Sequence, residues 1–147
     1  MNQEVIILIT EDEDGHALLI RKNLKRSGIH NKTIRFRNGQ EILDFLFCQG
    51  EGPHMEEGNH YLLLLDIRMP KIDGIEVLRQ VKEDPELYKI PIAMLTTTDD
   101  PREVEKCHEY GCNYYITKPL DHDKFVKVIL QMGLFFKIIS IPVIVQD

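Results

Sequence analysis

The chain has few cysteines, no excess of basic residues and no apolar run long enough to cross a bilayer. Its three cysteines, Cys48, Cys107 and Cys112, form no CxxC pair and no metal-ligand spacing, which argues against a disulfide framework or a zinc site. An odd number of thiols without a signal peptide is typical of a cytoplasmic protein. A membrane-spanning helix needs about 20 apolar residues. No segment supplies them, so we expect no contact with a membrane.

The charge balance argues against nucleic acid as a partner. Lys and Arg together number 18 and Asp and Glu 24, a formal net charge of -6, and there is no dense basic run. With 43% hydrophobic and 29% charged residues, the 147-residue chain has the composition of an ordinary globular protein with one core. A protein or a cation is the more plausible partner.

Short apolar runs alternate five times with amphipathic segments. Strands are predicted at residues 5–9, 33–36, 61–65, 90–95 and 113–117, and each is followed by a helical pattern. Asp14 is expected to cap the first helix and Gly28 to end it. Right-handed crossovers turn this alternation into a doubly wound parallel sheet, an α/β fold with helices on both faces. A long loop covers residues 49–60.

Polar residues follow four of the strands at the point where each ends. They are Glu11 and Asp12, Asp66, Thr96, and Lys118. The carboxyl ends of parallel strands share one edge, where open α/β sheets place their chemistry. Taken singly, an acid could cap a helix, and Lys118 could simply pair with Asp66. Their coincidence at all of these strand ends favours a shared site.

These residue types suit phosphoryl transfer to a carboxylate. Asp66 would be the nucleophile and form an acyl phosphate. Crowded carboxylates repel one another unless a cation neutralises them, and an oxygen-rich site suits Mg²⁺. The metal and the ammonium of Lys118 would balance the charge of the phosphoryl group, and the hydroxyl of Thr96 could donate a hydrogen bond to it.

The chain resembles the receiver domain of two-component response regulators. The motifs that carry the resemblance are Glu11-Asp12, LDIRMPKIDG at residues 65–74, LTT at 95–97 and YITKP at 115–119, and the match extends over residues 4–132. The resemblance implies a flavodoxin-like fold with strand order 2-1-3-4-5 and a receiver domain at residues 1–132. It also implies that a sensor histidine kinase donates a phosphoryl group to Asp66, so the protein is a signalling phosphoacceptor and not an enzyme.

The resemblance also implies a role for each site residue. Asp12 and Asp66 would bind Mg²⁺ directly, Glu11 through water, and Arg68 through its main-chain carbonyl. Thr96, Thr97 and Lys118 would bind the phosphoryl group. Thr96 and Tyr115 would form a switch pair; the alternative, which we consider less favoured, is that Tyr115 is a buried core tyrosine. Arg68 and Thr98 would flank the path of the attacking water.

After residue 132 the sequence is strongly apolar and too short for an output domain. Residues 133–147 could pack back on their own domain or cover a partner subunit, and we favour a homodimer. Together with the long acidic loop and the triple threonine 96–98, this extension resembles the small receivers that partner phytochrome kinases. The other hypothesis is a binding module of the same fold, either a pseudo-receiver or a flavin binder. A flavin phosphate would be repelled by the acidic run 11–14, and no Gly/Ser/Thr loop follows the first strand to bind it.

Overall fold

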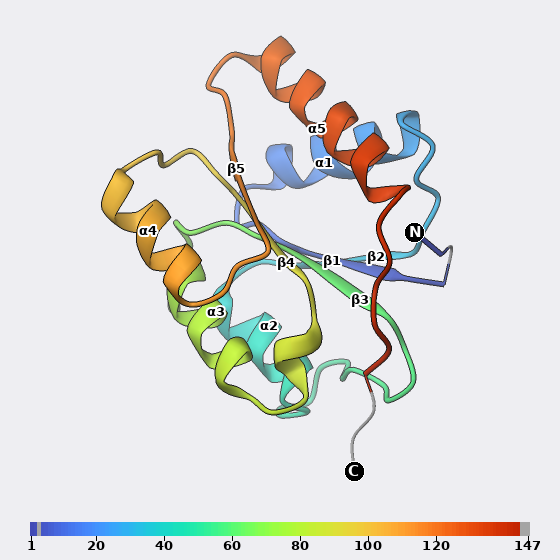
Figure 1. Ribbon diagram of the computed structural model, residues 1–147, viewed down its shortest axis with the longest axis vertical. Coiled ribbons are helices and arrows are strands. Elements are labelled where there is room, and N and C mark those ends of the chain that lie inside the picture. The colour runs from blue at the N-terminus through green and yellow to red at the C-terminus, as the bar shows by residue number, and fades with distance from the viewer. Residues whose placement is uncertain (3, 145–147) are drawn as a thin grey trace.

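The computed structural model describes residues 1–2 and 4–144 and contains one sheet of five parallel strands, in the order β2-β1-β3-β4-β5 (Figure 1). The strands are β1 (Ile6–Thr10), β2 (Thr33–Phe36), β3 (Tyr61–Leu65), β4 (Ile92–Thr96) and β5 (Tyr114–Thr117). The predicted flavodoxin-like fold and its strand order are confirmed. The all-apolar sequence of β3 fits its place at the centre of the sheet, where both faces are covered.

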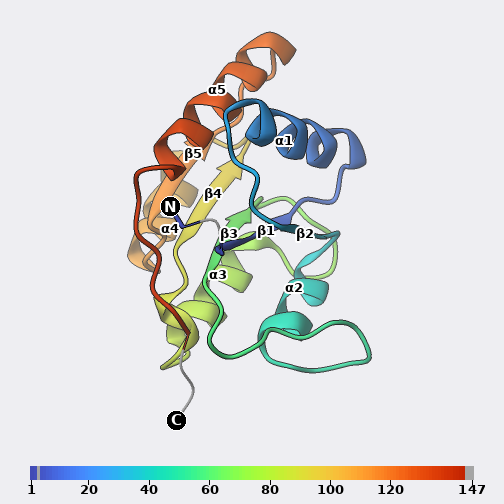
Figure 2. The same cartoon turned by 90° about the vertical axis from the view of Figure 1, so that its right-hand side faces the viewer.

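Helices cover both faces of the sheet. They are α1 (Asp14–Arg26), α2 (Gly39–Leu46), α3 (Gly74–Glu83), α4 (Pro101–Glu109) and α5 (His122–Phe136), with a short 3₁₀ helix, η1, at Leu87–Lys89. Helices α1 and α5 lie side by side on one face, and α2, α3 and α4 lie on the other (Figures 1 and 2). This two-sided arrangement leaves the carboxyl ends of the strands open at one edge.

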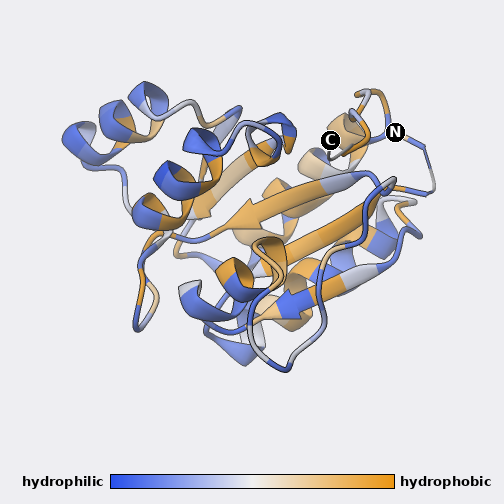
Figure 3. Cartoon of the chain, turned by 90° about the horizontal axis from the view of Figure 1, so that it is seen from below, coloured by the Kyte–Doolittle hydropathy of each residue, from blue (hydrophilic) through white to orange (hydrophobic). Residues whose placement is uncertain are grey.

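Two hydrophobic cores separate the layers, because neighbouring residues of a strand point to opposite faces. On β1, Ile7 and Ile9 pack toward α1 and α5, whereas Leu8 packs toward α2, α3 and α4. The same alternation along β3 sends Leu62 and Leu64 to the first core and Leu63 to the second. The central strands β1, β3 and β4 are accordingly apolar over most of their length, whereas the edge strand β2 carries the polar residues Thr33 and Arg35. Polar residues also lie on the outer faces of the helices (Figure 3).

Local structure departs from the sequence prediction most clearly at the first helix cap and at the start of β4, whereas the bounds of β1 and β5 shift by one residue only. Asp14 is the first helical residue and not the cap; Glu13 is the cap residue, and the Asp14 carboxylate bonds to Arg35 instead. Strand β4 begins at Ile92, two residues later than predicted, because the N–H of Ile90 bonds back to Leu87 in η1 and Pro91 has no N–H to donate to a neighbouring strand. Gly28 follows the helix with a φ of 96°, as expected of a residue that ends a helix in the left-handed region.

The described part of the C-terminal extension lies against its own domain. After α5 the chain runs past the amino-terminal ends of the strands toward β3 (Figures 1 and 2). There Val143 forms an antiparallel bridge with His60, and Ile144 is fully buried in the core beneath α2 and α3. Packing in cis is one of the two arrangements that the sequence left open. The remaining residues of the extension, 145–147, lie outside the described part.

Within residues 1–2 and 4–144, no helix is both long and apolar enough to cross a membrane.

Candidate functional site

The carboxyl edge of the sheet brings three acids together. In register, Thr10 of β1 lies between Phe36 of β2 and Leu65 of β3, so the residues that follow β1 and β3 emerge side by side. Glu11, Asp12 and Asp66 each offer a carboxylate oxygen, and these three oxygens lie within 4.8 Å of one another. Glu11 and Asp66 are buried and Asp12 is exposed. The cluster thus has one face open to solvent.

Lys118 brings a buried positive charge to this cluster. Its ammonium donates hydrogen bonds to Glu11 and, at 3.0 Å, to Oδ2 of Asp66, and its side chain is only 2% exposed. Burial alone would lower the pKa of Lys118, but the charge of Asp66 and the contact with Glu11 raise it overall. Burial raises the pKa of Glu11, against the opposing effect of Lys118. The lysine therefore stays an ammonium beside the carboxylate of Asp66.

The loop after β3 is folded tightly against Asp66. A Cβ on Gly74 would lie 2.0 Å from the carbonyl oxygen of Asp66, so only glycine allows α3 to begin this close. Asp73 caps α3 by accepting a hydrogen bond from Glu76. The main-chain N–H of Arg68 turns back toward Oδ1 of Asp66, at 3.4 Å. The glycine and the cap thus place the loop beside the acidic cluster.

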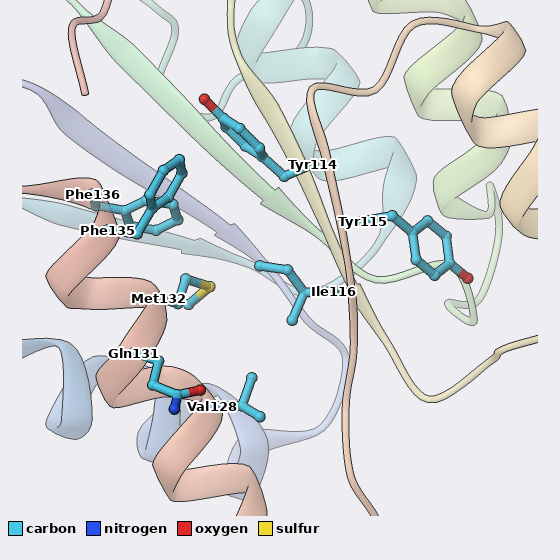
Figure 4. Close-up of a pocket in the computed structure, with 8 residues that line it drawn as sticks. All are labelled: Tyr114, Tyr115, Ile116, Val128, Gln131, Met132, Phe135 and Phe136. Atoms are coloured by element: carbon cyan, nitrogen blue, oxygen red, sulfur yellow. The ribbon is translucent and has the colours of Figure 1, made fainter. Parts of the chain in front are cut away.

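The threonines and the tyrosine occupy different positions around the site. Thr96 is fully buried, and its hydroxyl has no hydrogen-bond partner in the described chain. Thr97 is exposed and lines a shallow depression together with His16 and Pro119. Tyr115 is half-buried and packs against the core on the side of α2, α3 and α4, and its hydroxyl donates to the carbonyl of Thr98 at 2.8 Å. In Figure 4 its ring points away from Tyr114 and Ile116, its neighbours on β5.

Several contacts at the site involve residues that sequence reasoning did not assign to it. Nδ1 of His16 lies 3.2 Å from Nζ of Lys118 and 3.3 Å from Oε1 of Glu11. Glu103 on α4 accepts hydrogen bonds from the side chains of Arg68 and Thr98. The contacts of His16 with Lys118 and of Arg68 with Glu103 join segments far apart in the sequence, and no local pattern marks them. Of these residues, only Thr98 could have been connected with the site from the sequence, because it lies two positions after the end of β4.

The donor set of the acidic cluster fits a hard divalent cation. Its ligand atoms are all carboxylate oxygens, and the exposed Asp12 leaves room for water molecules, which Mg²⁺ retains in most protein sites. The single positive charge of Lys118 does not neutralise three carboxylates, so a cation would relieve the remaining repulsion. These features define the class of protein: a doubly wound α/β protein with an acidic pocket suited to a divalent cation and a buried lysine at its carboxyl edge.

Comparisons with known proteins identify the family within this class. The model of the response regulator receiver domain matches residues 7–130. Response regulator Rcp1 of Synechocystis sp. is 34% identical over 135 residues, which cover 92% of this chain and 90% of Rcp1. The chain belongs to the response regulator receiver family.

Solved structures support the assignment. A response regulator receiver domain from Rhodospirillum rubrum is 40% identical with a TM-score of 0.90, covering 96% of this chain and 99% of that one. The Mn²⁺-bound form of Rcp1 is 33% identical with a TM-score of 0.84, over 93% and 98% of the two chains. The phosphorylated cyanobacterial phytochrome response regulator RcpA is 28% identical with a TM-score of 0.82, over 93% and 97%. The chain is therefore similar to response regulators of phytochrome signalling.

Proposed function

We propose that this response regulator accepts a phosphoryl group on Asp66 from the phosphohistidine of a sensor histidine kinase, in a reaction that depends on Mg²⁺. The observation that carries the proposal is the buried contact of Lys118 with Asp66 inside a cluster of three carboxylates. A lone carboxylate at a strand end has many structural uses. A carboxylate that shares its site with a buried ammonium and an open acidic face suits phosphoryl transfer.

The chain's own residues account for most of the chemistry. A carboxylate oxygen of Asp66 attacks phosphorus, the bond from phosphorus to the imidazole nitrogen breaks, and the imidazole leaves with that electron pair. Lys118 places positive charge beside the acceptor oxygen. Glu11, Asp12, Asp66 and the main-chain carbonyl of Arg68 would hold Mg²⁺, which would supply further positive charge to the phosphoryl oxygens when bound.

The orphan hydroxyl of Thr96 supports a role as a phosphoryl ligand. A buried hydroxyl without a partner is costly, and an incoming phosphoryl oxygen would provide the missing acceptor. Thr97, exposed at the same strand end, would bind the group from the solvent side. The inward movement of Thr96 would free space for Tyr115 to leave its hydrogen bond with Thr98, which changes the face formed by α4 and β5.

A phytochrome histidine kinase is the donor that we favour, and the cytoplasm is where we expect the two proteins to meet. Support comes from the similarity of most of the chain to Rcp1 and to the cyanobacterial phytochrome response regulator RcpA. A phosphotransfer panel tests this assignment. A purified phytochrome kinase should phosphorylate the protein faster than unrelated histidine kinases do, and equal or slower transfer would contradict it.

We also propose that the protein is a homodimer in which residues 133–147 contribute to the contact. Ile144 is used within its own domain, but Leu134, Phe135 and Ile138 keep 56%, 41% and 79% of their surfaces exposed near the end of α5. Exposed apolar side chains this close together favour association. Sedimentation should give a dimer that Ile138→Glu weakens, whereas a monomeric wild-type protein would refute it.

Acetyl phosphate tests the phosphoacceptor proposal without a kinase. Incubation with Mg²⁺ should add one phosphoryl group to the intact protein, as measured by mass spectrometry, and Asp66→Asn should abolish the addition. Asp123→Asn is the matched control, because the side chain of Asp123 is 94% exposed on α5. A wild-type protein that gains no phosphoryl group, with Asp66→Asn indistinguishable from it, would favour the pseudo-receiver hypothesis.

A further inference from the structure

Arg35, on the edge strand β2, makes contacts that reach the acidic cluster from outside. Its guanidinium donates two hydrogen bonds to the main-chain carbonyl of Glu11, from Nε at 3.0 Å and from Nη2 at 2.8 Å. A third bond, from Nη1, goes to the carboxylate of Asp14 in the first turn of α1. One side chain thus holds both ends of the loop that joins β1 to α1.

The bonded carbonyl belongs to the peptide group between Glu11 and Asp12. This peptide is planar, so fixing its oxygen fixes the plane from which the Asp12 main chain starts. The preceding peptide is held from the same strand, because the N–H of Glu11 donates to the carbonyl of Phe36 at 3.0 Å. Strand β2 therefore holds the main chain on both sides of Glu11.

The geometry of these contacts suits a positioning role. The guanidinium of an arginine is a planar fork of N–H donors, so it fixes the direction of a bonded carbonyl as well as its distance. The ammonium of a lysine acts as a point charge and fixes no such direction. The side chain of Arg35 is only 13% exposed, so water competes weakly for its hydrogen bonds. The neighbouring Arg37 also reaches Asp14, at 3.3 Å, but it is 64% exposed, and its side chain is bonded to Asp14 and not to the Glu11 carbonyl.

We propose that Arg35 is a positioning residue for the metal site: it fixes the peptide between Glu11 and Asp12 so that both carboxylates face Asp66. The role rests on the proposed Mg²⁺ site. Partners that orient metal ligands typically change metal affinity by about 10–100-fold when removed. We expect Arg35→Ala and Arg35→Lys to weaken Mg²⁺ binding by about tenfold, at the lower end of that range.

If Arg35 acted only through its positive charge, its removal would change the Mg²⁺ affinity in the opposite direction. Removing a positive charge beside an acidic pocket strengthens cation binding, so Arg35→Ala would then bind Mg²⁺ more tightly. Arg35→Lys keeps the charge and loses the fork, so a charge effect would leave its affinity unchanged. Arg37→Ala is the matched control, because it removes a positive charge beside Asp14 and leaves the two hydrogen bonds of Arg35 to the Glu11 carbonyl in place.

Calorimetric titration with Mg²⁺ alone tests the proposal on the wild-type protein and these three variants. The expected result is weaker binding for both Arg35 variants and unchanged or tighter binding for Arg37→Ala. A second readout is the amide chemical shift of Asp12, which reports the hydrogen bonds to its own peptide; it should move in Arg35→Lys and not in Arg37→Ala.

Affinities within about twofold of wild type for both Arg35 variants would overturn the proposal, as would an unchanged amide shift, and the phosphoacceptor site would still stand. A wild-type protein that binds no Mg²⁺ would refute the metal site and, with it, the role of Arg35. If Arg35→Ala fails to fold, the conservative Arg35→Lys variant carries the test.

Discussion

Replacing Lys118 by methionine removes the buried ammonium and keeps a side chain of similar length. Glu11 and Asp66 would then face each other without their shared partner, in a site where their side chains are 3% and 10% exposed. Breaking a buried ion pair by removing one partner typically costs about 3–5 kcal/mol, because it leaves uncompensated charge in the interior. Two carboxylates lose their partner here, and Asp66 is partly open to water. We therefore expect Lys118→Met to lower the free energy of unfolding by about 3 kcal/mol, the lower end of that range.

The loss of stability in Lys118→Met should be larger at neutral pH than at acidic pH. The pKa of Lys118 is raised in the folded protein, so its contribution is fully present at pH 7 and is lost only as the pH rises through that raised pKa. In the variant, the unpaired carboxylates become easier to protonate. The stability difference should therefore shrink as the pH falls toward about 4, near the ordinary carboxyl pKa. At neutral pH the full difference remains.

Urea unfolding at pH 7 without Mg²⁺ measures the effect, with Lys127→Met as the control, because Lys127 lies exposed on α5. A loss of about 3 kcal/mol corresponds to roughly 10 °C in melting temperature for a chain of this size. Adding Glu11→Gln to Lys118→Met should recover about 1 kcal/mol by removing one unpaired charge. A loss below about 1 kcal/mol, or no recovery in the double variant, would refute the assignment of Lys118 as the counter-charge of the cluster.

Three further predictions concern backbone, thiols and charge. Gly74→Ala should destabilise the fold by more than about 2 kcal/mol in urea unfolding, because the added Cβ meets a backbone carbonyl at 2.0 Å. Gly15→Ala, in open space on α1, should instead stabilise it by up to about 1 kcal/mol. A thiol reagent should label the exposed Cys48 rapidly in the native protein and leave Cys107 unlabelled, since burial raises the pKa of Cys107 to about 12. Hydrogen bonds from Arg79 lower the pKa of Glu76 to about 2. The stability that the ionised Glu76 contributes to the fold is therefore present above pH 4.5 and lost as the pH falls toward 2. Glu76→Gln should therefore cost about 0.5 kcal/mol at pH 7 and nothing at pH 2; an equal cost at both would contradict this.

The fold could be predicted because its determinants are local and repetitive. A run such as residues 61–65 is apolar throughout and too short for a helix, so it indicates a doubly covered strand wherever it occurs. Strand order followed from the family resemblance. The proximity of Asp66, Glu11 and Lys118 followed from topology alone, because parallel strands end at the same edge.

Details that depend on competition between partners could not be predicted. Asp14 has the residue type of a helix cap, and nothing nearby in the sequence shows that Arg35, 21 positions away, binds its carboxylate instead. The predicted strand began at residue 90, but the N–H of Ile90 bonds back to Leu87 at the end of η1, a short helix whose start is held by two hydrogen bonds to the side chain of Asp84. In both cases the hydrogen bonds that an aspartate accepts shape the local structure, and hydrophobic periodicity does not predict them.

The two sides of the acidic pocket are held with unequal strength, which indicates where a change at Asp66 would be transmitted. On the β2 side, a largely buried arginine binds main-chain atoms. On the α4 side, the link from Arg68 through Glu103 to Thr98 uses side chains only, and Arg68 is 66% exposed. Exposed ion pairs contribute about 0–1 kcal/mol, so a new charge on Asp66 could displace this link more readily than the arginine fork. Because Thr98 also accepts the hydrogen bond of Tyr115, loss of the link would free the β4–α4 loop and the tyrosine together. We therefore expect phosphorylation to reshape the α4–β5 face and leave β2 and the first turn of α1 in place.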